Sequence, residues 1–309
     1  MDYIDFHCDT ASRLFYKDKE LFRNDFSVDI EKMIQGECLA QFFAMFINNK
    51  DLQSPLQTAL DMIDNFYREL DKNKDYIRLA LDYKTLMDNK SSNKISAFLT
   101  IEEGEALEGN IDNLKLFYNK GIRLITFTWN YENSIGFPHI MKDKASFGLK
   151  NFGKELVQAM NYYKILIDVS HLNDEGFKDV LEISDYPVVA SHSNSRAIKG
   201  NSRNLKDDMI RKLANKGGLM GLNFCSDFMA ENYKTKIDDI KKHIHHIINV
   251  GGIDVLALGS DFDGIPNQVE IKNVSEMNKL HLALRGELSE DDIEKIYYKN
   301  ALRVLKDAL

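Results

Sequence analysis

The sequence of 309 residues predicts a (β/α)8 barrel, a closed ring of parallel strands with helices around it. The first reason is that short, almost continuously apolar runs recur along the chain, as expected for parallel strands buried on both faces. The second is that segments with helical periodicity separate these runs. The third is that acidic or histidine side chains follow five of the runs. The carboxyl ends of barrel strands meet at one mouth, whereas the alternative fold, a doubly wound open sheet, would spread these side chains along an edge.

Eight apolar runs have the length of strands, and we expect them to form the barrel in this order: Tyr3–Phe6, Leu39–Ile47, Ile95–Ile101, Ile122–Thr128, Ile165–Val169, Pro187–Ala190, Leu219–Asn223 and Val255–Leu258. The segments expected to be helical are Leu56–Leu70, Asn110–Asn119, Gly148–Tyr163, Asp174–Ile183, Lys206–Asn215, Lys236–Val250 and Ser289–Asp307. Gly121 follows the second of these segments, where a glycine commonly ends a helix. Ser289 and Asp292 have the spacing of a capping box, which predicts the start of the last helix.

The composition limits the kind of protein that this chain can be. The hydrophobic content of 44%, with 4 prolines and no low-complexity segment, predicts a single domain over residues 1–309. The net charge of −8 argues against nucleic acid as a partner. Because there is no run of about 18 apolar residues and no signal-peptide pattern, we expect neither a membrane span nor a secretory leader. The widely spaced Cys8, Cys38 and Cys225 favour free thiols in a reducing cytoplasm.

Histidines and carboxylates follow five of the predicted strands, and they are the candidate metal ligands and acid–base groups: His7 and Asp9, Glu102, His171, His192 and Asp261. His7 and Asp9 are two residues apart, so in a regular strand both side chains would lie on one face. Imidazole and carboxylate groups at one mouth suit two divalent cations, and Glu102 is the candidate for a carboxylate shared by both. Two cations that share a water produce hydroxide near neutral pH. Asp261 could accept the proton and pass it to a leaving amine.

Several neighbouring residues compete for these roles. Any one of the histidines alone would more often be structural, so the metal site is inferred from the five strand ends together. Glu103 and Glu105 are rivals of Glu102, but we expect loop carboxylates there because the third apolar run extends unbroken only to Ile101. Asp263 is a rival of Asp261. We assign no metal site to the other histidines, which are expected on a solvated helix face (His243, His245, His246) or stand alone (His139, His281).

Six segments, taken together and in order, resemble the membrane dipeptidase (renal dipeptidase) family, peptidase family M19: His7-x-Asp9, Ile101-Glu102-Glu103-Gly104, Asp168-Val169-Ser170-His171, Ala190-Ser191-His192-Ser193, Ser202-Arg203-Asn204 and Gly259-Ser260-Asp261-Phe262-Asp263-Gly264. The resemblance covers nearly the whole chain, and the combination of motifs is specific. It implies a TIM-barrel metallopeptidase, usually a homodimer, that uses two Zn²⁺ ions to hydrolyse dipeptides, including those with a D-residue at the C-terminal position. Mn²⁺ or Co²⁺ would suit the same ligands.

The resemblance also implies a role for each matched residue. The metal ligands would be His7 and Asp9 for one zinc, His171 and His192 for the other, and Glu102 as the bridge. Arg203 matches the arginine that grips the C-terminal carboxylate of the substrate, a task that suits a bidentate guanidinium. Asp261 matches the aspartate that handles the proton.

The sequence departs from the mammalian members of the family after the fourth strand. Trp129 stands where those members have a substrate-binding histidine, although bacterial members look similar to this chain there. We expect Trp129 and the adjacent Asn130 to contact the substrate. An indole donates one hydrogen bond but cannot titrate, so we expect the substrate range to differ. The chain also lacks the leader and lipid-anchor patterns of the animal forms, which predicts a soluble cytoplasmic enzyme.

Two other functions are compatible with the same ligands. One is another binuclear-metal amidohydrolase, of the lactonase, phosphotriesterase or deaminase type. Many of these bridge their metals with a modified lysine on the fourth strand, and the run Ile122–Phe127 contains no lysine, which argues against that subgroup. The other is a barrel that binds metal without catalysis, with Trp129 as a sign of decay. Every matched metal position is intact, which argues against it.

Overall fold

A computed structural model describes residues 1–48 and 54–309. At its centre, eight parallel strands form a closed ring: β1 (Tyr3–Cys8), β2 (Cys38–Phe46), β4 (Ile95–Glu102), β5 (Ile122–Thr126), β6 (Leu166–Asp168), β7 (Val189–Ala190), β8 (Leu219–Leu222) and β9 (Leu256–Leu258). Neighbours in this order pair with one another, and the ring closes where β9 pairs with β1. The predicted (β/α)8 barrel is confirmed, each predicted strand is present within a few residues of its predicted bounds, and the open-sheet alternative is wrong.

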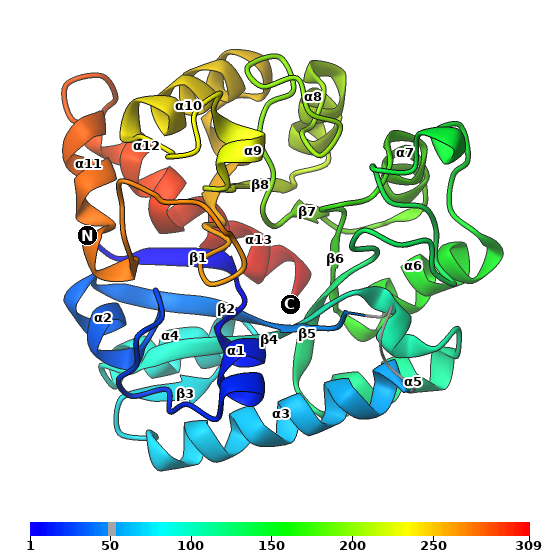
Figure 1. Ribbon diagram of the computed structural model, residues 1–309, viewed down its shortest axis with the longest axis horizontal. Coiled ribbons are helices and arrows are strands. Elements are labelled where there is room, and N and C mark those ends of the chain that lie inside the picture. Colours follow the sequence, from blue (N-terminus) through cyan, green and yellow to red (C-terminus); the bar gives the residue numbers. More distant parts are fainter. Residues whose placement is uncertain (49–53) are drawn as a thin grey trace.

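Helices surround the strands (Figure 1). In chain order they are α1 (Thr10–Lys17), α2 (Ile30–Gln35), α3 (Pro55–Lys72), α4 (Tyr83–Ser91), α5 (Ile111–Asn119), α6 (Asn151–Tyr163), α7 (Asp174–Ile183), α8 (Asp207–Asn215), α9 (Ser226–Met229), α10 (Ile237–Gly251), α11 (Asn278–Leu284), α12 (Glu290–Glu294) and α13 (Asn300–Ala308). The predicted helical segments are all found, whereas α1, α2, α4, α9 and α11 are too short to show a clear helical period in the sequence. Within the described part of the chain, no helix combines the length and the apolar character needed to cross a bilayer.

Two local features differ from the sequence prediction. β3 (Ile77–Leu79) pairs with β4 outside the ring, and its three residues are too few to form a recognisable pattern. The helix predicted over Ser289–Asp307 is divided into α12, a π-helical turn at Lys295–Lys299, and α13. The hydroxyl of Ser289 accepts a hydrogen bond of 3.1 Å from the backbone N–H of Asp292, so the predicted cap is confirmed.

β1 is irregular where the first candidate ligand motif, His7-x-Asp9, begins. Between Asp5 and Cys8, β1 has three steps where its partner β2 has two, which is the geometry of a β-bulge. β1 ends at Cys8, and Asp9 is the N-cap residue of α1. The prediction that His7 and Asp9 share one face of a regular strand is therefore wrong. The bulge and the turn into α1 orient the two side chains instead.

The interior of the ring is filled with apolar side chains below the strand ends. The ring of Phe42 stacks on those of Phe6 and Phe98, with centroids 4.5 and 4.6 Å apart. α13 joins the same buried cluster through Val304 and Leu305. Burying this apolar surface closes one end of the barrel. The candidate ligands lie outside this cluster, at or just after the carboxyl ends of the strands.

Candidate active site

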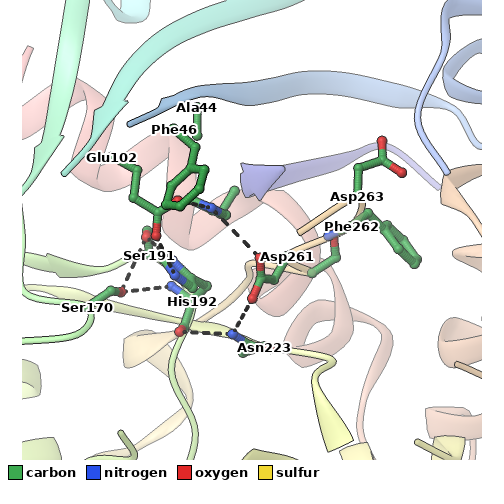
Figure 2. Close-up of polar contacts among 12 residues, drawn as sticks. Ala44, Phe46, Glu102, Ser170, Ser191, His192, Asn223, Asp261, Phe262 and Asp263 are labelled. Atoms are coloured by element: carbon green, nitrogen blue, oxygen red, sulfur yellow. Dashed lines mark hydrogen bonds and ion pairs between the residues drawn. The ribbon is translucent and has the colours of Figure 1, made fainter. Parts of the chain in front are cut away.

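The six residues predicted as ligands or acid–base groups meet at the mouth of the barrel: His7 from β1, Asp9 from the turn after it, Glu102 at the end of β4, His171 after β6, His192 after β7 and Asp261 after β9. Oε2 of Glu102 lies 3.1 Å from Nε2 of His7. Oε1 of the same carboxylate lies 3.3 Å from Nε2 of His171 and 3.5 Å from Nε2 of His192. Figure 2 shows Glu102 close to His192, with Asp261 facing the same space. Glu102 therefore presents one oxygen to each side of the mouth.

The donor atoms of these residues suit metal ions. Two sets, His7 with Glu102 and His192, and His7 with Asp9 and Asp261, place one donor atom per residue within 4.8 Å of the others. Both ring nitrogens of His7 and Oδ1 of Asp9 are buried and have no hydrogen-bond partner among the described residues. Buried polar atoms without partners are unfavourable, and a coordinated cation would satisfy them. The side chains present therefore fit divalent ions with mixed nitrogen and oxygen ligands.

Negative charge is concentrated in the mouth. Burial lowers the pKa of His7, but the carboxylates of Glu102, Asp9 and Asp261 outweigh it and raise that pKa to about 10. Burial raises the pKa of Asp9 well above its usual value, and the charge of Glu102 adds to the effect. Burial tends to raise the pKa of Glu102 as well, but the neighbouring histidines outweigh this effect and hold its pKa well below the usual value. Carboxylates grouped in this way favour a divalent cation as their counter-ion.

Hydrogen bonds determine which nitrogen of two histidines faces the mouth. The hydroxyl of Ser191 donates to Oδ2 of Asp168 at 2.6 Å, so its oxygen is free to accept from Nδ1 of His192, also at 2.6 Å. Oδ1 of Asn130 lies 3.3 Å from Nδ1 of His171 and accepts from it in the same way. With Nδ1 protonated, each ring has the lone pair of Nε2 available for a cation, and the two Nε2 atoms lie 3.0 Å apart. Asn130, predicted to contact substrate, therefore also orients a candidate ligand.

Two buried aspartates that the sequence analysis did not single out hold the strand ends. Oδ1 of Asp168 accepts from the backbone N–H groups of Ser170 and Ser191 at 2.9 and 2.8 Å. Asp5 accepts from the backbone N–H and the hydroxyl of Ser260 at 2.8 and 2.5 Å. Each aspartate lies in an apolar strand, two or three residues before a candidate ligand. That position was the available signal, because a carboxylate in a buried strand needs partners.

Asp261 and Asp263 have different hydrogen-bond partners in the structure. Oδ2 of Asp261 accepts from the side-chain amide of Asn223 at 2.9 Å (Figure 2), which leaves Oδ1 toward the candidate ligand His7. Burial raises the pKa of Asp261 to about 6. The oxygens of Asp263 instead accept from the hydroxyl of Thr10 at 2.6 Å and the backbone N–H of Ser27 at 2.7 Å. This arrangement favours Asp261 as the acid–base group and Asp263 as a residue that holds loops.

Gly264 is required by the close approach of two of these carboxylates. A Cβ atom at this position would overlap Oδ2 of Asp9 and Oδ1 of Asp261. We expect Gly264→Ala to displace them and to weaken metal binding by about 10- to 100-fold. Competition with a chromophoric chelator measures this change. Gly200→Ala, whose Cβ would meet no atom within 4 Å, is the matched control, and equal affinities in the two variants would contradict the expectation.

Glu103, a rival of Glu102 in the sequence, supports the neighbouring loop. It precedes the 3-10 turn Gly104–Leu107 as its N-cap and accepts from the backbone N–H of Trp129 at 2.9 Å and from the side-chain amide of Asn133. Burial raises its pKa to about 7. Glu103 is therefore a loop carboxylate, as expected, and it positions the segment that carries Trp129.

The expectation of a solvated helix face is wrong for His243. This side chain is buried on the apolar face of α10, next to Ile244, and its Nδ1 accepts from the backbone N–H of Ser195 at 3.1 Å. His245 and His246 lie on the solvent side of the same helix, as expected, and pair with carboxylates. His243 shares the buried face of α10 with Ile240, Ile244 and Ile247, so one description could not fit all three histidines.

His139, which the sequence analysis left without a role, lies beside the mouth. Its backbone N–H donates to the carbonyl of His171 at 2.7 Å, and the centroids of the two rings are 6.1 Å apart. Nδ1 of His139 lies 2.9 Å from the hydroxyl of Ser202. The residue belongs to a long irregular segment between β5 and α6, where no periodic pattern places a side chain in advance.

A cavity of about 660 Å³ opens from the candidate ligands toward solvent. Trp129 and Asn130 line it, and the indole packs edge-on against Phe46 with centroids 4.9 Å apart. Arg203 is not among the described residues that line this cavity. It is buried, and it donates to the hydroxyl of Ser193 at 2.7 Å and to the carbonyl of His192 at 2.8 Å. Its contact with substrate therefore remains a prediction.

Comparison with known proteins places these features in context. The family model described as membrane dipeptidase (peptidase family M19) matches residues 1–309. An uncharacterized dipeptidase of Schizosaccharomyces pombe is 31% identical over 296 residues, which cover 90% of this chain and 71% of the relative. The dipeptidase tcpJ of Claviceps purpurea is 26% identical over 317 residues, with coverage of 99% and 73%. A crystal structure of a metallo peptidase from Rhodobacter sphaeroides, liganded with a phosphinate mimic of the dipeptide L-Ala-D-Ala, has the same fold, with a TM-score of 0.92, 24% identity, and coverage of 100% and 99%.

Proposed function

Because the chain belongs to the membrane dipeptidase family, peptidase family M19, and is therefore a metal-dependent dipeptidase, we propose that it hydrolyses dipeptides, L-D dipeptides included, with two Zn²⁺ ions. The observation that carries the binuclear part is the position of Glu102, whose two oxygens face different histidines at 3.1 and 3.3 Å. His7 and Asp9 would hold one ion, and His171 and His192 the other. When bound, the ions would lower the pKa of a water molecule and polarise the scissile carbonyl.

Asp261 takes the proton of the attacking water and returns it to the leaving amine. Burial raises the pKa of this carboxyl to about 6, so near neutral pH it can both accept and donate a proton. The side-chain amide of Asn223 holds one oxygen at 2.9 Å and directs the other toward the mouth. A carboxyl held in this way transfers protons without having to reorient.

Arg203 holds the C-terminal carboxylate of the substrate. Its guanidinium is buried beside His192, and its Nε is buried with no hydrogen-bond partner among the described residues. A buried guanidinium with unused N–H donors is suited to a carboxylate. This contact would restrict hydrolysis to short peptides with a free C-terminus, and Trp129 and Asn130 would contact the substrate from the other wall.

Arg203→Ala is expected to raise KM for a dipeptide by about tenfold or more, because a charged hydrogen bond to the substrate is lost, and to change kcat less. The matched control is Arg211→Ala, on the exposed side of α8. An amidated dipeptide, which lacks the carboxylate, should be hydrolysed equally by wild type and Arg203→Ala. Metal content should not change. An unchanged KM for the free dipeptide would show that Arg203 only supports the loop around His192.

We further propose, on the family resemblance, that the chain acts as one domain over residues 1–309, as a homodimer, and in the cytoplasm. The three cysteines are buried and free, which is compatible with a reducing compartment.

The substrate class is tested by hydrolysis of a panel with one metal-loaded preparation. We expect turnover of L-Ala-L-Ala and L-Ala-D-Ala that a chelator abolishes and added Zn²⁺ restores. Lactones and phosphotriesters should not be hydrolysed. Turnover of a lactone or a phosphotriester with none of a dipeptide would overturn the proposal in favour of another amidohydrolase activity.

A further inference from the structure

One wall of the cavity carries positive charge that the proposed mechanism does not use. α1 contributes Arg13 and Lys17 to this wall, together with the ring of Tyr16. Both cations are exposed, and neither lies within ion-pair distance of a carboxylate in residues 1–48 and 54–309, although Arg13 acts electrostatically on Asp263, another residue of the cavity wall. The guanidinium of Arg13 lies 5.6 Å from the ring centroid of Phe26, a contact that leaves its N–H donors free. The wall formed by α1 therefore offers two cations to the cavity.

Helix stability does not account for both cations. Lys17 lies in the last turn of α1, where a positive charge interacts favourably with the helix dipole. Arg13 lies one turn earlier on the same side, and two like charges four residues apart repel one another. An anion bound between them would offset this repulsion, so the pair suits a negatively charged group of a ligand.

The order of the strands shows which part of a dipeptide would reach these cations. α1 follows β1, whereas Arg203 lies after β7. In the ring, β8 and β9 separate β1 from β7 on one side, and β2, β4, β5 and β6 separate them on the other. The two positive groups therefore lie on well-separated parts of the rim, with the metal ligands between them. A dipeptide with its carboxylate on Arg203 and its scissile carbonyl at the ligands would extend its N-terminal residue toward α1.

We propose that this enzyme prefers dipeptides whose N-terminal residue has an acidic side chain, which Arg13 and Lys17 bind. This inference rests on the proposed function. The cavity of about 660 Å³ leaves room for a side chain longer than that of alanine. Besides the candidate metal ligands, two carboxylates line the cavity, Asp227 on α9 and Asp263 near Arg13. An acidic side chain would therefore have to lie against the two cations themselves, away from Asp227.

Hydrolysis of L-Glu-L-Ala and L-Gln-L-Ala tests the preference, because the two substrates differ in charge at almost constant size. We expect wild type to have a kcat/KM about fivefold higher for the glutamyl substrate, since each exposed ion pair contributes a factor of a few. In Arg13→Gln/Lys17→Gln the ratio should approach one. In Arg13→Glu/Lys17→Glu the preference should change to L-Lys-L-Ala. Added salt should lower the wild-type ratio, because it screens exposed charges.

Two controls make the outcome specific. Lys19→Gln removes a cation just beyond α1 that does not line the cavity, and it should keep the wild-type ratio. In L-Ala-L-Glu and L-Ala-L-Gln the variable side chain is on the C-terminal residue. The kcat/KM values of these two substrates should differ less than those of L-Glu-L-Ala and L-Gln-L-Ala. Turnover of these dipeptides without a charge preference, or a ratio that survives in Arg13→Gln/Lys17→Gln, would overturn this inference alone. No turnover of any dipeptide would overturn the proposed function and this inference with it.

Discussion

Glu102→Gln is expected to lower kcat/KM for a dipeptide by about 10³-fold or more, because several kcal/mol of metal-derived stabilisation of the transition state depend on this carboxylate. The two oxygens of Glu102 lie 3.1 Å from Nε2 of His7 and 3.3 Å from Nε2 of His171. A neutral amide would present one oxygen and one N–H group to ligands that need an anion between them. Elemental analysis should therefore find fewer bound ions as well as lower activity.

Glu105→Gln is the matched control for this prediction. Glu105 is three residues away, was a rival for the same role, and accepts from the backbone N–H of Ser134 at 2.7 Å, outside the cavity. This variant should keep its metal content and its activity. If Glu102→Gln retained both the wild-type metal content and the wild-type rate, a bridging role for Glu102 would be excluded.

Asp261→Asn is expected to lower kcat by about 10²- to 10⁴-fold, the usual range for removal of a general acid–base group. An asparagine has nearly the shape of aspartate but cannot accept and return the proton. KM should change less than kcat, because the change affects the chemical step. Steady-state kinetics on protein of measured metal content separates this effect from the loss of an ion.

Asp263→Asn tests the choice between the two aspartates. Asp263 accepts from the hydroxyl of Thr10 and the backbone N–H of Ser27. Its substitution should therefore lower the thermal midpoint Tm and leave kcat nearly unchanged. A larger loss of kcat in Asp263→Asn than in Asp261→Asn would reverse the assignment.

The strands could be predicted from the sequence because parallel barrel strands are buried on both faces and read as apolar runs. β3 could not be found in the same way. It has only three residues, Ile77–Leu79, it lies outside the ring, and its central residue, Arg78, is exposed. The bulge in β1 could not be predicted either, because the register between β1 and β2 depends on the partner strand as well as on β1. For this reason the prediction of a shared strand face for His7 and Asp9 was wrong in detail although the two side chains do come together.

The candidate ligands could be located because each follows a recognisable strand, and the fold brings strand ends to one place. Groups that reach the mouth from irregular or helical segments gave no such signal. His139 comes from a long loop, and Arg13 and Lys17 come from a helix too short to be recognised in advance. Arg203 was identified only because the segment around it resembles the family motif. Its burial beside His192 depends on the tertiary structure and could not be predicted from the sequence.

The binuclear site is tested most directly by titrating Zn²⁺ into chelator-treated protein while bound metal and dipeptide hydrolysis are followed together. We predict that activity rises until two ions are bound per chain and then stays constant. Glu102→Gln, measured in parallel, should not reach this end point. Full activity with one ion per chain, or two bound ions with no hydrolysis of any dipeptide, would contradict the account.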